Sequence, residues 1–463
     1  MQQYSNIPRV VIGAPQGRSG KTTVTLGLIS ALLARGLKVQ AFKKGPDFID
    51  PSWLSKLTGR PCRNLDTFLM ERDVIRSSFA EGCLDADIAI VEGAMGLFDG
   101  VDVVGSGSTA EIAKVVKSPV ILVVNATRMT RSVAATVCGF ADFDEDVHIG
   151  GIILNKVARP RHENMLRASI EKYCDVPVIG AVPKGETFII PDRHLGLIPA
   201  DEDDKFFKPV GEMGKAIEQH LDLDKLLDIA KTAETLKYTS AGEPAKIRHG
   251  ARIGVIRDRS FSFYYPENIE ALASLGARLV FMDALVDKHL PPVDALYIGG
   301  GFPEIFARDL EKNSSFRHAL RQKIEEGLPV YAEGGGLMYL GRKLYWNGKG
   351  QDMVGALPYD VEMVNKPRGH GYVVTHIQEE NPYLECGATV KAHEFHHSQI
   401  VNLDRSKVRF AHEIKRGWGI DGRNDGILYR NVLASYSHIH ASSATGWAAN
   451  LVKKAASFRE GKH

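Results

Sequence analysis

The sequence lacks an excess of one charge, a long apolar run and a clear targeting segment. Fifty-eight Lys and Arg residues stand against 56 Asp and Glu residues, a formal net charge of +2, so nothing points to nucleic acid or a membrane surface as a partner. No apolar run approaches the roughly 18 residues of a membrane-spanning helix. The polar stretch Met1–Pro8 contains no apolar core of a signal peptide. We therefore expect a cytoplasmic protein.

Cysteine is also sparse. The chain has five, Cys62, Cys83, Cys138, Cys174 and Cys386, and their spacing is not that of a metal site. An odd count argues against a disulfide framework. We expect reduced thiols in the core or at the surface.

What is present is the composition of a globular protein, with 44% hydrophobic and 25% charged residues. At 463 residues the chain is too long for one hydrophobic core, and about two to three domains are expected. The segment 238–250 is polar and is typical of a linker. A fresh α/β pattern begins after it, so we predict one domain over residues 1–240 and a second over residues 251–450.

The most informative stretch is Val10–Thr23, which reads V-V-I-G-A-P-Q-G-R-S-G-K-T-T. Its apolar start predicts a short buried strand, and the pattern Lys21–Ala34 predicts a helix. Glycines in the loop between them let backbone N–H groups face a polyphosphate at the helix N-terminus. The strict motif has glycine where this chain has Pro15, so this is a variant phosphate loop. The predicted ATP contacts are Gly17, Ser19, Gly20, Lys21, Thr22 and Thr23.

Carboxylates follow the predicted strands at the edge where open α/β sheets bind ligands. Asp47 and Asp50 lie in the expected loop 43–51, and Glu92 ends the strand predicted over 87–91. In a phosphate-loop protein the hydroxyl after the lysine, here on Thr22, and a carboxylate placed like Glu92 hold Mg²⁺. We predict Thr22, Glu92 and Asp47 as metal ligands, although Asp47 and Asp50 also suit turn capping.

Further candidates lie nearby in the first half. Asp99 follows in a loop flanked by glycines, where an ordinary turn aspartate is the alternative. Near-continuous apolar runs at 120–125, 149–157 and 178–182 predict buried strands of a parallel sheet. Asn155 and Lys156 lie at the end of the run 149–157, where side chains often contact the base or ribose of a nucleotide. Arg193 and His194 are candidates for contact with an anionic substrate.

The second half contains a strand that breaks abruptly into a helix. The strand P-V-Y-A (Pro329–Ala332) runs into E-G-G-G and then L-M-Y-L. Many acyl-transfer enzymes present a nucleophile on such an elbow, but here the residue at the elbow is Gly334. Two further stretches, His393–Ser398 and Ser435–His440, alternate like strands of the same sheet.

The chain resembles the cobyrinate a,c-diamide synthases and their relatives that act on other tetrapyrroles. The resemblance rests on ordered motifs along nearly the whole chain: G-K-T-T-V-T-L-G-L, F-K-K-G-P-D-F-I-D-P, R-N-L-D, V-E-G-A-M-G-L-F-D-G, G-S-T-A-E-I-A, Y-Y-P-E-N-I-E-A-L, G-G-G-F-P-E, H-E-F-H-H-S and A-S-Y-S-H-I-H. It implies an α/β protein of two doubly wound domains. The first would be a dethiobiotin-synthetase-like ATP-binding domain and the second a class I glutamine-amidotransferase-like domain.

The resemblance also implies the chemistry. ATP with Mg²⁺ would phosphorylate an acetate carboxylate of the tetrapyrrole, and ammonia would displace the phosphate. By transfer of the motifs, Lys21, Thr22 and Glu92 handle ATP and metal, while Asp47 and Asp99 orient the substrate and the phosphoryl group. The sequence does not fix the oligomeric state, and a homodimer is one arrangement open to the chain.

The chain departs from the family pattern at one position. The family's elbow reads A-E-C-G-G-L-M-Y-L, and this chain reads A-E-G-G-G-L-M-Y-L, with Gly334 in the cysteine's place. His438, the expected base, then has no thiol to activate, although the oxyanion loop Gly299–Gly301 remains. Losing the nucleophile removes several orders of magnitude of activity, so we expect ammonia to replace glutamine. A siroheme or nickel-sirohydrochlorin a,c-diamide synthase and a non-catalytic tetrapyrrole-binding or regulatory protein remain alternatives.

Overall fold

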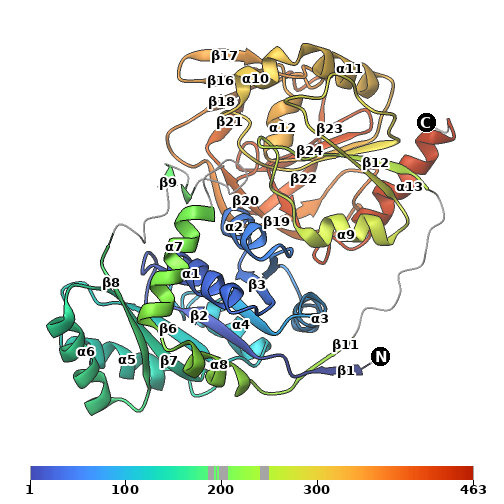
Figure 1. The fold of residues 1–463 in the computed structure, drawn as a ribbon. Coiled ribbons are helices and arrows are strands. Elements are labelled where there is room, and N and C mark those ends of the chain that lie inside the picture. The colour runs from blue at the N-terminus through green and yellow to red at the C-terminus, as the bar shows by residue number, and fades with distance from the viewer. Residues whose placement is uncertain (1, 186–191, 194–195, 198–206, 240–249, 462–463) are drawn as a thin grey trace. The chain divides into compact units, whose positions relative to one another are not determined.

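A computed structural model describes residues 2–185, 192–193, 196–197, 207–239 and 250–461. The chain divides into two units, Met1–Gly242 and Glu243–His463 (Figure 1). No helix in the described ranges combines the length and apolarity needed to span a bilayer.

The first unit is built on a seven-stranded sheet whose neighbouring strands are all parallel. Its strand order is β4–β3–β5–β2–β6–β7–β8. The bounds are Arg9–Gly13 for β2, Val39–Lys44 for β3, Arg63–Leu65 for β4, Ile88–Glu92 for β5, Val120–Asn125 for β6, Ile149–Val157 for β7 and Val178–Pro183 for β8. The crossover order places β2 between β5 and β6, so the loop after β2 opens at the carboxyl edge between them.

Helices cover both faces of this sheet. They are α1 (Lys21–Ala34), α2 (Ile49–Thr58), α3 (Arg72–Gly82), α4 (Thr109–Val115), α5 (Ser132–Asp142), α6 (Pro160–Tyr173), α7 (Phe207–His220) and α8 (Leu223–Lys231). Side chains alternate along a strand, so Val10 and Ile12 join the core beneath α1, α2, α7 and α8, while Val11 joins the core beneath α3 to α6. Helices α1 and α7 lie side by side (Figure 1).

Two short antiparallel ribbons complete the unit: β1 (Gln2–Ser5) with β11 (Leu236–Thr239), and β9 (Asp192–Arg193) with β10 (Gly196–Leu197). The bounds predicted for the loop 43–51 are wrong at both ends, because β3 extends through Lys44 and α2 begins at Ile49. Asp47 shapes that helix start, since its Oδ1 accepts a hydrogen bond from the N–H of Ile49 at 2.8 Å. Asp50 therefore lies in the first turn of α2.

Arg9 is fully buried at the start of β2. Its guanidinium donates to the carbonyls of Val116 at 2.6 Å, Ile7 at 2.9 Å and Lys117 at 3.1 Å, and to that of Glu234. The carbonyls at the end of α4 thus gain partners that a helix end does not supply itself. Burial lowers the pKa of Arg9 to about 10.

The expectation that all cysteines are reduced is wrong for one pair. Cys138 on α5 and Cys174 after α6 form a disulfide, with α-carbons 5.7 Å apart. Cys62 and Cys83 are buried thiols outside the disulfide, and Cys386 is an exposed one. The pairing depends on the packing of α5 against α6, which the spacing of cysteines in the sequence does not reveal.

The second unit contains a ten-stranded sheet in the order β13–β12–β14–β15–β24–β23–β22–β19–β20–β25. Its first five strands are parallel: β12 (Arg252–Ile256), β13 (Arg278–Met282), β14 (Ala295–Ile298), β15 (Val330–Glu333) and β24 (Val432–Ser435). The others extend it antiparallel: β19 (Gly369–Ile377), β20 (Thr389–His396), β22 (Arg409–Arg416), β23 (Asn424–Tyr429) and β25 (His438–Ile439). As expected, the two histidine-rich stretches contribute strands to the same sheet, and the structure also pairs them, with His393 opposite His438.

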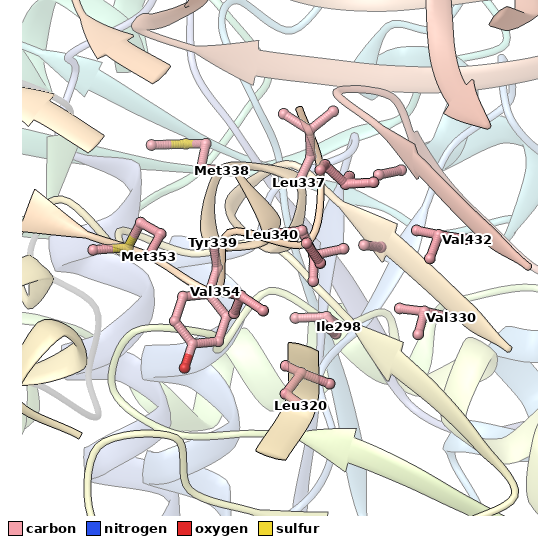
Figure 2. Packing of buried hydrophobic residues seen from close by; sticks show 14 of the residues in the cluster. Ile298, Leu320, Val330, Leu337, Met338, Tyr339, Leu340, Met353, Val354 and Val432 are labelled. Atoms are coloured by element: carbon pink, nitrogen blue, oxygen red, sulfur yellow. The ribbon is translucent and has the colours of Figure 1, made fainter. Parts of the chain in front are cut away.

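Helices again cover both faces. One core forms beneath α10 (Ala307–Lys312), α11 (Ser314–Glu325) and α12 (Gly335–Leu340), where Leu337 and Leu340 pack on Ile298, Val330 and Val432 (Figure 2). The opposite core forms beneath α9 (Pro266–Ser274) and α13 (Trp447–Arg459), around the buried Trp447. A separate four-stranded sheet joins β16 (Lys343–Trp346), β17 (Lys349–Asp352), β18 (Asp360–Met363) and β21 (Ser398–Val401).

Candidate functional site

The loop between β2 and α1 has the backbone of a phosphate-binding loop. Gly20 adopts φ +94°, which favours glycine. A Cβ at Gly20 would lie 2.2 Å from Nδ2 of Asn155, and that amide donates to the carbonyl of Ser19 at 2.8 Å. The hydroxyl of Ser19 donates to the carbonyl of Gln16 at 2.9 Å. Asn155 therefore holds the loop, and its expected contact with a base or ribose stays a prediction.

Lys21 begins α1 and is buried. Its ammonium donates to the carbonyl of Met95 at 2.5 Å. Burial and the nearby charge of Lys43 lower the pKa of Lys21 to about 8. The turn that supplies this carbonyl is closed by Asp99, which accepts the N–H of Gly96 at 2.8 Å. Asp99 thus shapes the wall facing Lys21.

A cluster of buried charges surrounds the ammonium of Lys43 at the carboxyl edge of the sheet. Its Nζ lies 2.5 Å from Oδ2 of Asp50, 2.9 Å from Oε1 of Glu92 and 3.7 Å from Oδ2 of Asp47. The hydroxyl of Thr22 donates to the same Glu92 oxygen at 2.6 Å. Burial would lower the pKa of Lys43, but the three carboxylates outweigh it and hold that pKa well above its ordinary value.

The two aspartates of this cluster differ in their surroundings. Burial and the charge of Asp50 raise the pKa of Asp47 to about 7. Burial also acts to raise the pKa of Asp50, but its contact with Lys43 outweighs burial and lowers that pKa. Asp50 also lies 3.4 Å from the hydroxyl of Thr22. The structure therefore places Asp50, which was not a predicted metal ligand, beside the predicted ligand Thr22.

The donor set at this edge fits a divalent cation that brings further ligands with it. Oε2 of the fully buried Glu92 accepts no hydrogen bond from the described residues, and a hydroxyl and carboxylate oxygens are ligands that Mg²⁺ prefers. Across the described ranges, no three His, Cys, Asp or Glu side chains form a metal-holding group by themselves. A cation here would rely on Thr22, Glu92, Asp50 and phosphate oxygens.

In the second unit, Gly334 is the single residue that connects the end of β15 to the start of α12. Its φ of +48° and ψ of −105° give the sharp turn of an elbow, and its N–H donates to the carbonyl of Ser435 at 2.8 Å. The loop Gly299–Gly301 packs against this turn, since the N–H of Gly336 donates to the carbonyl of Gly299 at 3.1 Å. The shape of an acyl-transfer elbow is present without a nucleophilic atom.

His438 lies over this elbow. A Cβ built on Gly334 would lie 2.6 Å from Nε2 of His438. A Cβ built on Gly300 would lie 2.4 Å from Cε1 of the same imidazole. The imidazole thus fills the space that a side chain at position 334 would enter. On its other side, Nδ1 lies 3.7 Å from Oε2 of Glu333. His440, the other candidate base, instead has its Nε2 3.5 Å from Glu267.

Buried polar groups hold the segment that carries His438. Glu333 accepts the N–H of Ile439 at 2.9 Å. Asp425 accepts the N–H groups of Tyr436 and Ser437, both at 3.0 Å. Backbone N–H groups bonded to buried carboxylates fix this segment at a defined position. The histidine is therefore positioned although the thiol is missing.

Sequence reasoning named most residues of the first cluster but gave Lys43 no role and did not choose Asp50 as a ligand. Lys43 carried a signal, because it ends an apolar strand at the ligand-binding edge. Asp50 was considered beside Asp47 for a metal or substrate role, but Asp47 was preferred because the start of α2 was not expected. The described structure does not include the side chains of Arg193 and His194. Thr23 lies in the first turn of α1.

These features define a class: a phosphate-loop nucleotide-binding unit joined to a unit of amidotransferase type. Residues 10–198 match the family described as the CobQ/CobB/MinD/ParA nucleotide binding domain, and residues 252–446 match the CobB/CobQ-like glutamine amidotransferase domain. These matches confirm the predicted fold class.

Curated relatives identify the family more closely. A cobyrinate a,c-diamide synthase of Magnetococcus marinus is 46% identical over 96% of this chain and 97% of its own. One of Archaeoglobus fulgidus is 43% identical over 97% of this chain and 98% of its own. The chain belongs to the cobyrinate a,c-diamide synthase family and is an enzyme of the ligase type.

Proposed function

We propose that this protein amidates the a and c acetate carboxylates of cobyrinate, using ATP, and that ammonia supplies the nitrogen. One observation carries the proposal: the phosphate-loop cluster around Thr22 and Glu92 is complete, whereas the elbow carries Gly334 in place of a nucleophile. In this proposal residues 1–240 perform the amidation and residues 251–450 retain the amidotransferase fold. The named relatives support cobyrinate as the substrate.

The chemistry follows from the poor electrophilicity of a carboxylate. A carboxylate oxygen of the substrate attacks the γ-phosphorus of ATP, the bond to the bridging oxygen breaks, and ADP leaves. The lone pair of ammonia then attacks the acyl carbon of the acyl phosphate. The carbon–oxygen bond breaks, inorganic phosphate departs, and the nitrogen loses a proton to give the amide.

The residues of the first unit divide this work. Lys21 is placed to contact the phosphates once it exchanges the carbonyl of Met95 for a phosphate oxygen. Thr22 and Glu92, with Asp50 or Asp47, would hold Mg²⁺, which supplies positive charge to the β- and γ-phosphates. Asp47 and Asp99 orient the substrate and the transferring group.

The nitrogen source follows from the elbow. Glutamine hydrolysis by this fold needs a covalent nucleophile, and Gly334 has no side-chain atom to form the bond. His438 would serve as base only if a thiol lay beside it. Ammonia reaching the acyl phosphate needs neither group.

The experiment is mass spectrometry of the purified chain with ATP, Mg²⁺ and either ammonium or glutamine. Cobyrinate, sirohydrochlorin, siroheme and nickel-sirohydrochlorin are offered in parallel. We expect the diamide of cobyrinate with ammonium and no product with glutamine alone. A diamide of siroheme or nickel-sirohydrochlorin alone would reassign the substrate. Tetrapyrrole binding without any ADP formation would indicate a non-catalytic protein.

A further inference from the structure

Lys43 is the cation at the centre of the acidic cluster. Its ammonium contacts Asp50 at 2.5 Å and Glu92 at 2.9 Å, and its side chain is 5% exposed. The Thr22 hydroxyl bonds to the Glu92 oxygen that Lys43 also contacts. One ammonium therefore shares its oxygens with the groups proposed to hold Mg²⁺.

The other nearby lysines do not share these oxygens. Lys21 donates to the carbonyl of Met95. Lys44 follows Lys43 on β3, so its side chain points to the opposite face of the sheet. Without Lys43, the buried carboxylates would face one another with no cation between them, which is strongly unfavourable. Lys43 is the group that balances this charge in the protein without nucleotide.

We infer that Lys43 is an internal counter-ion that occupies the divalent-cation position until nucleotide binds, so that the metal enters only together with the nucleotide phosphates. The inference rests on the proposed ATP-dependent function. A cation bound to the Glu92 oxygen at the usual ~2.1 Å would lie only a few ångströms from the ammonium, and two desolvated like charges at that distance repel strongly. Phosphate oxygens add the negative charge that lets the metal take this position from the ammonium.

The consequence concerns metal binding rather than rate. The protein without nucleotide should bind a divalent cation weakly, because the cation must displace an ammonium. Removing that ammonium should strengthen metal binding in the absence of nucleotide. Lys43 is thus a positioning residue, which sets the order in which metal and nucleotide enter.

The test measures Mn²⁺ binding to the full chain by electron paramagnetic resonance of the free ion, without nucleotide. We expect Lys43→Met to bind Mn²⁺ about tenfold or more tightly than the wild type. Lys44→Met, which removes another buried positive charge from the same strand, should bind as the wild type does. Lys43→Arg keeps the positive charge, so it should bind Mn²⁺ as weakly as the wild type does. Equal affinity of wild type and Lys43→Met would overturn the inference.

A measurement on the wild type decides the matter if Lys43→Met does not fold. Thermal unfolding is followed with Mg²⁺ alone and with Mg²⁺ plus a non-hydrolysable ATP analogue. We expect a rise in melting temperature only when both are present, since only a ligand that binds the folded state stabilises it. An equal rise with Mg²⁺ alone would overturn the inference. Failure of the amidation assay would refute the proposed function and leave both binding measurements unaffected.

Discussion

The hydroxyl of Thr22 donates a 2.6 Å hydrogen bond to the carboxylate of Glu92, joining the first turn of α1 to the end of β5. Both residues lie at the carboxyl edge of neighbouring strands, beside the phosphate loop. The bond holds together the two oxygens that we propose as metal ligands, and such preorganisation is what a catalytic site requires.

Replacing Lys21 tests the phosphate loop. Lys21→Ala should lower ADP formation and amidation by on the order of a thousandfold, because the charge that the lysine gives to the phosphates is lost. Substrate-stimulated ADP release measures this, with circular dichroism to show that the fold is kept. Lys231→Ala, on the exposed face of α8, is the matched control. Unchanged ADP release by Lys21→Ala would disprove the assignment.

Kinetic measurements should distinguish the roles of Asp47 and Asp50, the two aspartates beside Lys43. Asp50→Asn removes the carboxylate that contacts both Lys43 and Thr22, so kcat should fall by about a hundredfold or more. Asp47→Asn keeps the side-chain oxygen that accepts the N–H of Ile49, and its effect should be smaller. Mg²⁺ dependence of the rate is the readout. A larger loss in Asp47→Asn would return the metal-ligand role to Asp47.

Restoring a thiol tests the elbow. Gly334→Cys should create glutamine-dependent amidation only if His438 moves aside, because its imidazole fills the space of the new side chain. Gly334→Ala is the control for that displacement and should gain no activity. Both variants place a side chain at φ +48°, which costs about 1 kcal/mol or more of stability. Glutamate release measures the outcome, and glutamine use by the unmodified chain would contradict the assignment.

The second unit should lose stability in mild acid. Burial, together with the nearby charges of His438 and His370, lowers the pKa of His393 to about 3. Between the ordinary value of about 6.5 and that lowered pKa, the unfolded chain binds a proton that the folded unit does not. Stability therefore falls with decreasing pH, by at most about 1.4 kcal/mol per pH unit from this group.

His393→Gln should flatten this dependence by close to one proton. The measurement is urea unfolding of the second unit at several pH values. His318→Gln, on the exposed face of α11, should leave the slope as it is. A His393→Gln slope equal to that of the wild type would show that another group is responsible.

Arg9 should matter for stability and not for chemistry. Arg9→Met leaves buried carbonyls without donors, so the free energy of unfolding of the first unit should fall by about 2–4 kcal/mol. Arg76→Met, which removes a partly exposed arginine of α3, should change it by less than about 1 kcal/mol. Chemical denaturation measures both, and equal effects would contradict the role of Arg9.

The sequence predicted the first unit well because its signals are local. The apolar run before the phosphate loop and the pattern after Gly20 predicted α1 over Lys21–Ala34, as observed. β6 and β7 also have the expected bounds. The elbow at Gly334 was visible for the same reason, since a strand, a glycine turn and a helix follow one another directly.

What was missed depends on packing between distant segments. The ammonium of Lys43 meets Glu92 only because β3 and β5 are neighbours in the sheet. Choosing between Asp47 and Asp50 required the start of α2, which propensity hides in a segment rich in Gly, Pro and Asp. The Cys138–Cys174 pair and the antiparallel extension of the second sheet likewise arise from contacts that no local pattern encodes.

The bare turn at Gly334 has a pharmacological consequence. An electrophile that inactivates an enzyme by alkylating a thiol finds no sulfur at this turn, because Gly334 has no side chain. Here such a compound meets only a hydrogen atom and a neighbouring imidazole. If ammonia supplies the nitrogen, as proposed, amidation by this protein should continue in the presence of such a compound.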